Sequence, residues 1–207
     1  NEVCRLIRAI GDFRKEANPR VTGYEFHILT LVSYVAPKHL IVDKLRETLE
    51  EIKTREPDAA DKYRARVVFV GSEVDDVDVI RLVEESGAYV CADRFCYGSL
   101  PGRDEILLND EEDVVKQVCR QVQGRAQCPR YWDMAKMTGR RDYVADLAKE
   151  YGADGIIYEQ MKFCDPWAYE RMIGTIVLRD EHGYPVLAVD RPYSVSYTHL
   201  RAHETRG

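Results

Sequence analysis

One stretch of sequence decides the fold: Gly155-Ile156-Ile157-Tyr158-Glu159-Gln160-Met161-Lys162-Phe163-Cys164-Asp165-Pro166-Trp167. Its first four residues form a short apolar run that is typical of a buried strand. Asp165 is a good helix N-cap and Pro166 suits the first helical position, which predicts a helix over residues 167–178. Cys164 is therefore expected just before a helix N-terminus, whose partial positive charge favours thiolate over thiol.

A thiolate at the carboxyl end of a strand is a natural ligand for a metal ion or cluster. Cys164 is therefore the candidate metal ligand of this chain. The alternative is a buried thiol that packs under the following helix as a small hydrophobic residue.

The rest of the chain repeats the alternation of strand and helix. Further apolar runs predict strands over residues 66–70, 88–92 and 185–189. Helices are expected over residues 78–86, 109–121 and 140–151. Such an alternation predicts a parallel sheet with right-handed crossovers. Residues 62–193 are thus expected to form a Rossmann-like or flavodoxin-like α/β domain, with a four-stranded parallel sheet flanked by helices.

A helical arm is expected before this domain, over residues 1–61, as the linker from a truncated upstream domain. Thr22 and Glu25 have the spacing of a capping box, and Pro37 opens a further helix that stops before Pro57. The chain begins without Met inside an expected helix, so it is interpreted as an internal fragment.

The last residues, 194–207, are expected to be non-native. The run from Val195 to Thr205 resembles the in-frame translation of a DNA-library adapter, so His199 and His203 are not counted as ligands. The alternative is a genuine polar tail, which carries no information about the fold.

Composition excludes several classes of protein. The chain has 207 residues, with 30 Lys and Arg against 36 Asp and Glu, and it has no basic stripe, which argues against nucleic-acid binding. No apolar run approaches the roughly 20 residues that span a bilayer, and no secretory signal is visible. A cytoplasmic, reducing location is therefore expected, without disulfides.

The six cysteines contain no C-x-x-C pair, which disfavours zinc ribbons and thioredoxin-like centres. Cys4, Cys119 and Cys128 are interpreted as small hydrophobic residues, and Cys91 as part of the core. For Cys96, beside Gly98 in a loop, the roles of ligand, pocket lining and inert thiol all stay open.

The loops after the strands carry the candidate binding residues. In a parallel sheet the carboxyl ends of the strands share one rim, where doubly wound folds bind ligands. The candidates for substrate binding there are Ser72, Glu73, Cys96 and Glu159. Alternatively, the acidic residues after the first strand only charge the first turn of the next helix. No G-x-G-x-x-G follows that strand, which disfavours a nicotinamide cofactor.

Three motifs occur in order along the chain: Val70-Gly71-Ser72-Glu73-Val74-Asp75-Asp76, Ala92-Asp93-Arg94-Phe95-Cys96-Tyr97-Gly98-Ser99, and the run from Tyr158 to Trp167. Together they resemble the D-component family of 2-hydroxyglutaryl-CoA dehydratases, which also holds the B and C subunits of ATP-dependent benzoyl-CoA reductases. The resemblance covers nearly all of residues 1–193.

The resemblance implies an oxygen-sensitive iron–sulfur enzyme of anaerobes. Its partner would be a paralogous second dehydratase subunit, and an ATP-dependent activator would inject one electron. A 4Fe–4S cluster would pass that electron to the thioester carbonyl of an acyl-CoA substrate. In the dehydratases the resulting ketyl radical anion expels the neighbouring hydroxyl, whereas in the reductases the electrons enter an aromatic ring.

Within this resemblance, Cys164 matches the last of three cluster cysteines and Cys96 is placed at the pocket. The other two ligands are expected upstream of Asn1, so the chain alone is expected to be inactive. The favoured function is a 2-hydroxyacyl-CoA dehydratase subunit. The alternatives are a benzoyl-CoA reductase subunit and, from another class, a catalytically silent partner or electron-carrier module.

Overall fold

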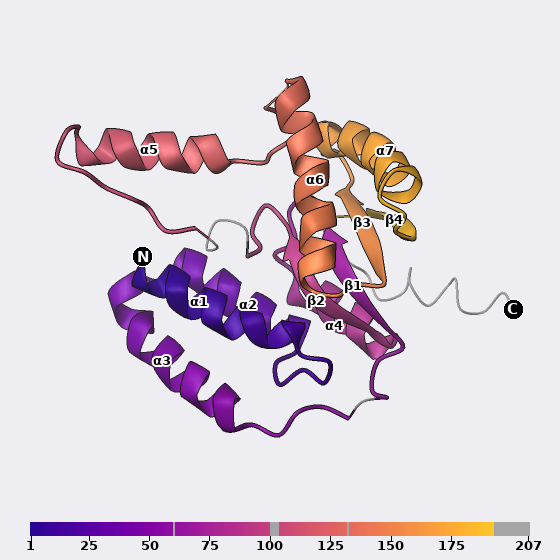
Figure 1. Cartoon of the computed structure of the whole chain (residues 1–207), viewed down its shortest axis with the longest axis horizontal. Coiled ribbons are helices and arrows are strands. Elements are labelled where there is room, and N and C mark those ends of the chain that lie inside the picture. Colours follow the sequence, from indigo (N-terminus) through magenta and orange to yellow (C-terminus); the bar gives the residue numbers. More distant parts are fainter. Residues whose placement is uncertain (60, 100–103, 132, 193–207) are drawn as a thin grey trace, which may run out of the picture.

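Four parallel strands form the centre of the molecule, in the order β2-β1-β3-β4 (Figure 1). Their bounds are β1 Ala65–Val70, β2 Ala88–Arg94, β3 Gly155–Met161 and β4 Val186–Arg191. The computed structural model describes residues 1–59, 61–99, 104–131 and 133–192. The predicted four-stranded parallel sheet is confirmed. Because the strand order reverses between β1 and β3, the ligand site of such a fold is expected at the carboxyl ends of these two strands.

Helices cover both faces of the sheet. The helices of the α/β part are α4 Val77–Glu85, α5 Val114–Arg125, α6 Met134–Glu150 and α7 Asp165–Asp180. α6 and α7 pack on one face, where Val68 and Val70 of β1 join their core, and α4 packs on the other face against Val67 and Phe69. β1 is therefore buried on both sides, as expected of a continuous β-branched run.

The predicted helical arm is present as α1 Glu2–Asp12, a 3-10 turn at Phe13–Lys15, α2 Gly23–Val35 and α3 Lys38–Thr54. It has a core of its own that includes Ile10, Phe26 and Ile52. The capping box is also confirmed, since Thr22 Oγ1 accepts from Glu25 N at 3.0 Å and Glu25 Oε2 accepts from Thr22 N at 2.9 Å.

A buried ion pair attaches the arm to the sheet. Arg14 Nη1 lies 3.0 Å from Asp93 Oδ1, and the Arg14 guanidinium lies over the Phe26 ring. Asp93 belongs to the carboxyl end of β2, so the arm is fastened at the rim where the candidate site residues lie.

Two helices begin more than one turn away from their predicted starts. The helix expected from Asn109 begins at Val114, because the Asp113 side chain caps it while the Asn109 side chain accepts from Glu111 N in a local turn. The helix expected from residue 140 begins at Met134 and is capped by Asp133. Residues 194–207, interpreted as an adapter-derived tail, lie outside the described residues.

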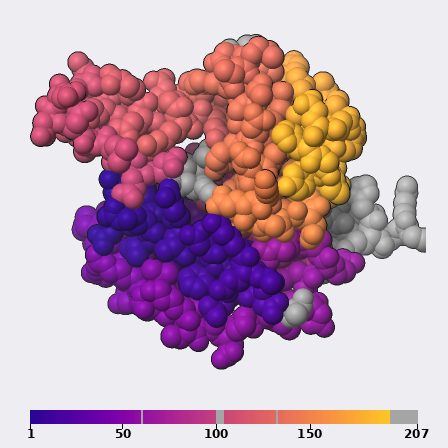
Figure 2. Space-filling view, viewed as in Figure 1, coloured from indigo at the N-terminus to yellow at the C-terminus, as the bar shows by residue number. Residues whose placement is uncertain are grey.

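α5 and the segments beside it project away from the rest of the molecule (Figure 1, Figure 2). The segment before α5 contacts the start of α1. Asn1 Nδ2 donates to the Ile106 carbonyl oxygen at 2.7 Å, and Ile106 N donates to Asn1 Oδ1 at 2.8 Å. Of the helices in the described ranges, none combines the length and apolar character needed to cross a bilayer.

His27 of α2 links the N-terminal helical arm to the loop after β1. Its Nε2 lies 2.8 Å from the carbonyl oxygen of Val74, and its Nδ1 has no hydrogen-bond partner in the described part of the chain. Burial lowers the pKa of His27, because a charged imidazolium would be removed from water there.

We expect this histidine to make the fold sensitive to acid. The unfolded chain binds the proton near the ordinary pKa of 6.5 and the folded chain binds it less readily. Stability is therefore retained above pH 6.5 and lost below it, by at most about 1.4 kcal/mol per pH unit. Urea unfolding of the full-length protein at pH 5.5 and 7.5 measures this loss, and His27→Gln should reduce it. The exposed His39→Gln is the control, and an equal reduction in both variants would contradict the assignment.

Candidate functional site

The carboxyl ends of β1, β3 and β4 are joined by a buried network around Glu159. Glu159 Oε2 accepts hydrogen bonds from Ser72 N at 3.0 Å and from Ser72 Oγ at 2.9 Å. Its Oε1 accepts from Arg191 Nε at 3.0 Å, and Arg191 Nη2 also donates to the carbonyl oxygen of Glu73. Ser72 Oγ accepts in turn from Met161 N at 2.8 Å. The predicted rim thus brings Ser72 and Glu159 together.

Glu159 is fully buried because β3 extends to Met161, three residues beyond the predicted end. Burial raises the pKa of its carboxyl, and Arg191 and Ser72 oppose that rise. Both oxygens of the carboxylate are engaged within the protein. Ser72 and Glu159 therefore hold the carboxyl ends of β1, β3 and β4 together. Their role in substrate binding stays a prediction.

Glu73 and Cys96 lie on the same rim. Glu73 raises the pKa of the nearby Tyr97 hydroxyl, and the Tyr97 side chain is 41% exposed. Cys96 N donates to the Ser72 carbonyl oxygen at 3.0 Å, which joins the loop after β2 to the loop after β1. The four predicted binding residues therefore come from the loops after β1 and β2 and from the last residues of strand β3, at the same rim. Asp76 instead caps α4, as the alternative interpretation of the acidic loop expected for it.

Cys164 is the N-cap residue of α7, a position that the sequence analysis assigned to Asp165. Its sulfur is half-buried, and the Cys164 side chain makes no capping hydrogen bond to the first turn of α7. Burial raises the pKa of the Cys164 thiol, because the loss of hydration disfavours the thiolate more than its surroundings favour it. The expected preference for thiolate is therefore wrong for the chain without a bound cation.

The residue before this cysteine has a strained backbone. Phe163 has a φ of 72° and its side chain is 97% exposed. A left-handed conformation is costly for a bulky residue and is retained where the surroundings impose it. Here the chain must turn from β3 into α7 within three residues, which the sequence pattern did not reveal.

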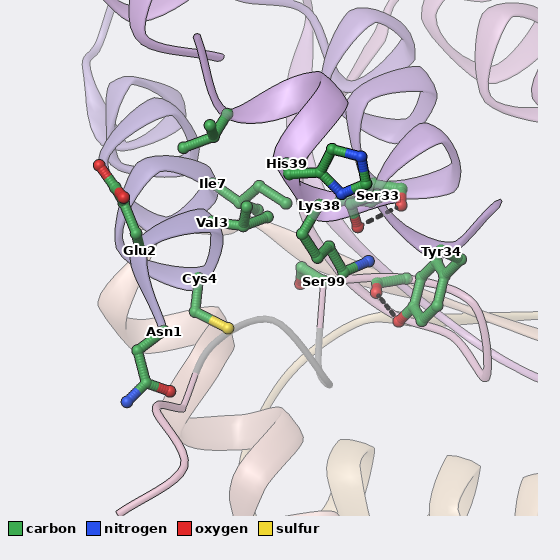
Figure 3. Close-up of a pocket in the computed structure, with 13 residues that line it drawn as sticks. Asn1, Glu2, Val3, Cys4, Ile7, Ser33, Tyr34, Lys38, His39 and Ser99 are labelled. Carbon is green, nitrogen blue, oxygen red and sulfur yellow. Dashed lines mark hydrogen bonds between the residues drawn. The ribbon is translucent and has the colours of Figure 1, made fainter. Parts of the chain in front are cut away.

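Two cavities lie near the rim. The larger, of about 510 Å³, lies between the helical arm and the loop after β2 (Figure 3). Tyr34, Lys38 and His39 line it, and the Tyr34 hydroxyl donates to the Gly98 carbonyl oxygen at 2.7 Å. The smaller, of about 220 Å³, adjoins Arg94 and Cys96. Neither was predicted, because distant segments of the chain form their walls.

Comparison with known proteins gives the family. The model of the family described as 2-hydroxyglutaryl-CoA dehydratase, D-component, matches residues 1–204. The chain belongs to this family. It is 30% identical over 138 residues to the (R)-phenyllactyl-CoA dehydratase beta subunit of Clostridium sporogenes, an alignment that covers 67% of the chain. The aligned part is 35% of that relative, so the chain spans about a third of its length. The resemblance drawn from the three motifs is confirmed.

In this D-component chain, Cys164 fits one position of a metal cluster but not a whole site. No group of three or more His, Cys, Asp or Glu side chains within the described ranges is arranged to hold a metal ion. The thiol is free and half-buried at the rim, directly before the first turn of α7, and a helix N-terminus favours an anionic ligand atom. The remaining ligands of a cluster would have to come from outside the described residues.

Gly71→Ala tests the rim network. A Cβ at position 71 would lie 2.4 Å from Glu159 Oε2 and 2.9 Å from the backbone oxygen of Glu159. We expect a loss of about 1–3 kcal/mol in the free energy of unfolding, because the overpacked carboxylate must move. Gly139→Ala in α6 is the control. A Cβ there meets nothing within 4 Å, so it should add about 0.5–1 kcal/mol. Equal effects in chemical denaturation would contradict the role of the network.

Proposed function

We propose that this chain is part of a 2-hydroxyacyl-CoA dehydratase subunit that uses an iron–sulfur cluster for one-electron chemistry on an acyl-CoA thioester. The observation that carries the proposal is the family match over residues 1–204. It is supported by the 30% identity to a dehydratase beta subunit and by a thiol, Cys164, at the carboxyl rim of the sheet. Doubly wound sheets bind their ligands at this rim.

Cys164 would hold the cluster as one of its thiolate ligands. A 4Fe–4S cluster supplies one electron at low potential when bound. The N-terminus of α7 would stabilise the anionic sulfur, and Cys164 packs against a buried core that includes Trp167. Glu159 and its partners set where β3 ends, and hence where Cys164 lies.

A single candidate ligand, Cys164, implies that other parts of the proposed enzyme supply the remaining ligands. Because one cysteine cannot hold a cluster, we infer that further cysteine ligands come from sequence upstream of this chain. A paralogous second subunit and an ATP-dependent activator complete the proposed enzyme. The beta-subunit name of the relative supports an assembly of more than one kind of chain.

The experiment that tests this function is an anaerobic assay of the full-length protein assembled with its partner subunit and reduced activator. Conversion of (R)-phenyllactyl-CoA or another 2-hydroxyacyl-CoA to the enoyl-CoA supports the proposal. Reduction of benzoyl-CoA without dehydration would assign the chain to the reductases. No turnover of either substrate, by an assembly that accepts electrons, would favour a catalytically silent module.

Cys164→Ala should remove the cluster and the activity. In the full-length protein reconstituted with iron and sulfide, we expect the visible absorption and iron content of this subunit to fall, and turnover to drop by roughly 10²-fold or more. Cys119→Ala is the matched control, because Cys119 is an exposed thiol on α5. Unchanged iron content in Cys164→Ala would overturn the assignment of the ligand.

A further inference from the structure

The α5 projection, residues 104–125, carries apolar side chains that nothing in the described chain covers (Figure 1, Figure 2). Five of them are 53–73% exposed: Leu107, Leu108, Val114, Val115 and Val122. None of the apolar side chains of this projection joins the hydrophobic cores that the described residues form. Exposed apolar side chains that gather on one element mark a surface that binds another protein.

Hydrogen bonds hold the projection in shape without an apolar core. Gln117 Oε1 accepts from Asn109 N at 2.9 Å, and Gln117 Nε2 donates to the Asn109 carbonyl oxygen at 2.8 Å. Gln121 Oε1 accepts from Leu107 N at 2.9 Å. Because Gln117 and Gln121 are four residues apart, they share one face of α5 and bind the preceding segment there. The apolar side chains are therefore held in place although they do not pack on the body of the protein.

A different face of α5 carries an apolar stripe. Val115, Val118 and Val122 have the i, i+3, i+7 spacing that places side chains on one side of a helix. In a helix that packs on its own protein, such a stripe faces the core. Here Val115 and Val122 are exposed to water. A helix that binds in the groove of a partner presents anchors with this spacing.

The tip of the projection is acidic. Asp110, Glu111 and Asp113 are exposed in the segment that leads into α5. Residues 104–125 contain six acidic side chains against three basic ones. A twofold interface between two copies of this chain would bring this surface against itself, where like charges repel. The complementary partner is therefore a different protein, with Lys or Arg side chains at the end of an apolar groove.

We propose that the α5 projection docks into an apolar groove of the second, non-identical subunit, with Val115, Val118 and Val122 as anchors and the acidic tip against Lys or Arg side chains. This inference rests on the proposed function, in which the beta-subunit name of the relative supports an assembly with another kind of chain. The 12 residues of α5 rise about 1.5 Å each, so the groove would be about 18 Å long.

The first test is anaerobic binding of the full-length protein to its separately purified second subunit. Val115→Lys should raise the Kd about tenfold or more, because the groove would bury an unpaired charge. Asp110→Lys combined with Glu111→Lys should lower the association rate constant about tenfold at low salt and by less at high salt. Val35→Lys is the control and should leave the Kd within about twofold, since Val35 is 84% exposed at the end of α2, outside the projection.

The second test identifies what covers the projection. A photoreactive benzophenone amino acid in place of Val114, which is exposed at the start of α5, should cross-link to the second subunit in the assembled enzyme. The same amino acid in place of Val35 should not. A cross-link only within the full-length chain, or only between two copies of it, would overturn the inference. Unchanged binding in both Val115→Lys and the charge-reversal variant would also overturn it.

These measurements do not depend on turnover, so the two proposals fail separately. Cross-linking to the second subunit in an assembly that dehydrates no 2-hydroxyacyl-CoA would support the docking surface and contradict the proposed function. Dehydration by an assembly whose projection cross-links only within its own chain would contradict the docking surface and support the proposed function.

Discussion

The carboxylate of Glu159 is the constraint on which the rim depends. A buried carboxylate that loses its partner costs roughly 3–5 kcal/mol, so the ends of β1, β3 and β4 must deliver Ser72 and Arg191 to it together. β3 and β4 stay paired as far as Met161 and Arg191 for the same reason. The end of β3 in turn sets the start of α7, and with it the position of Cys164. One buried charge therefore places the thiol.

A second buried ion pair, between Arg14 and Asp93, holds the helical arm against the sheet. Asp93 accepts from Arg14 of the arm and also from Ser99 N at 2.6 Å, so it shapes the loop after β2 while it holds the arm. Gly98 is required in that loop, because a Cβ there would lie 2.2 Å from Asp93 Oδ2. The motif between Ala92 and Ser99, which carries part of the family resemblance, therefore has a structural cause in the packing of a carboxylate.

The strands of the sheet could be predicted from the sequence, but the burial of its charged side chains could not. β-branched runs such as Val67-Val68-Phe69-Val70 are buried on both faces and are recognisable locally. Parallel topology alone predicted that Ser72 and Glu159 would meet. The burial of Glu159 was not predictable, because its partner Arg191 lies 32 residues further along the chain. The predicted start of α5 was wrong because Asn109 and Asp113 are both good N-cap residues. In the structure the Gln117 side chain bonds the Asn109 backbone and Asp113 caps the helix.

The two ion pairs leave the inner surface of the rim with an imbalance of charge. Glu159 is neutralised by Arg191 and Asp93 by Arg14, so the charge that stays uncompensated in the described interior of the rim is the cation of Arg94. The chain as a whole has a net charge of −6, and this local positive charge is therefore a property of the fold and not of the composition. Charges inside a protein act more strongly than charges in water. The buried guanidinium is therefore held by neutral partners, Gln127 and the Trp167 ring, and not by a carboxylate.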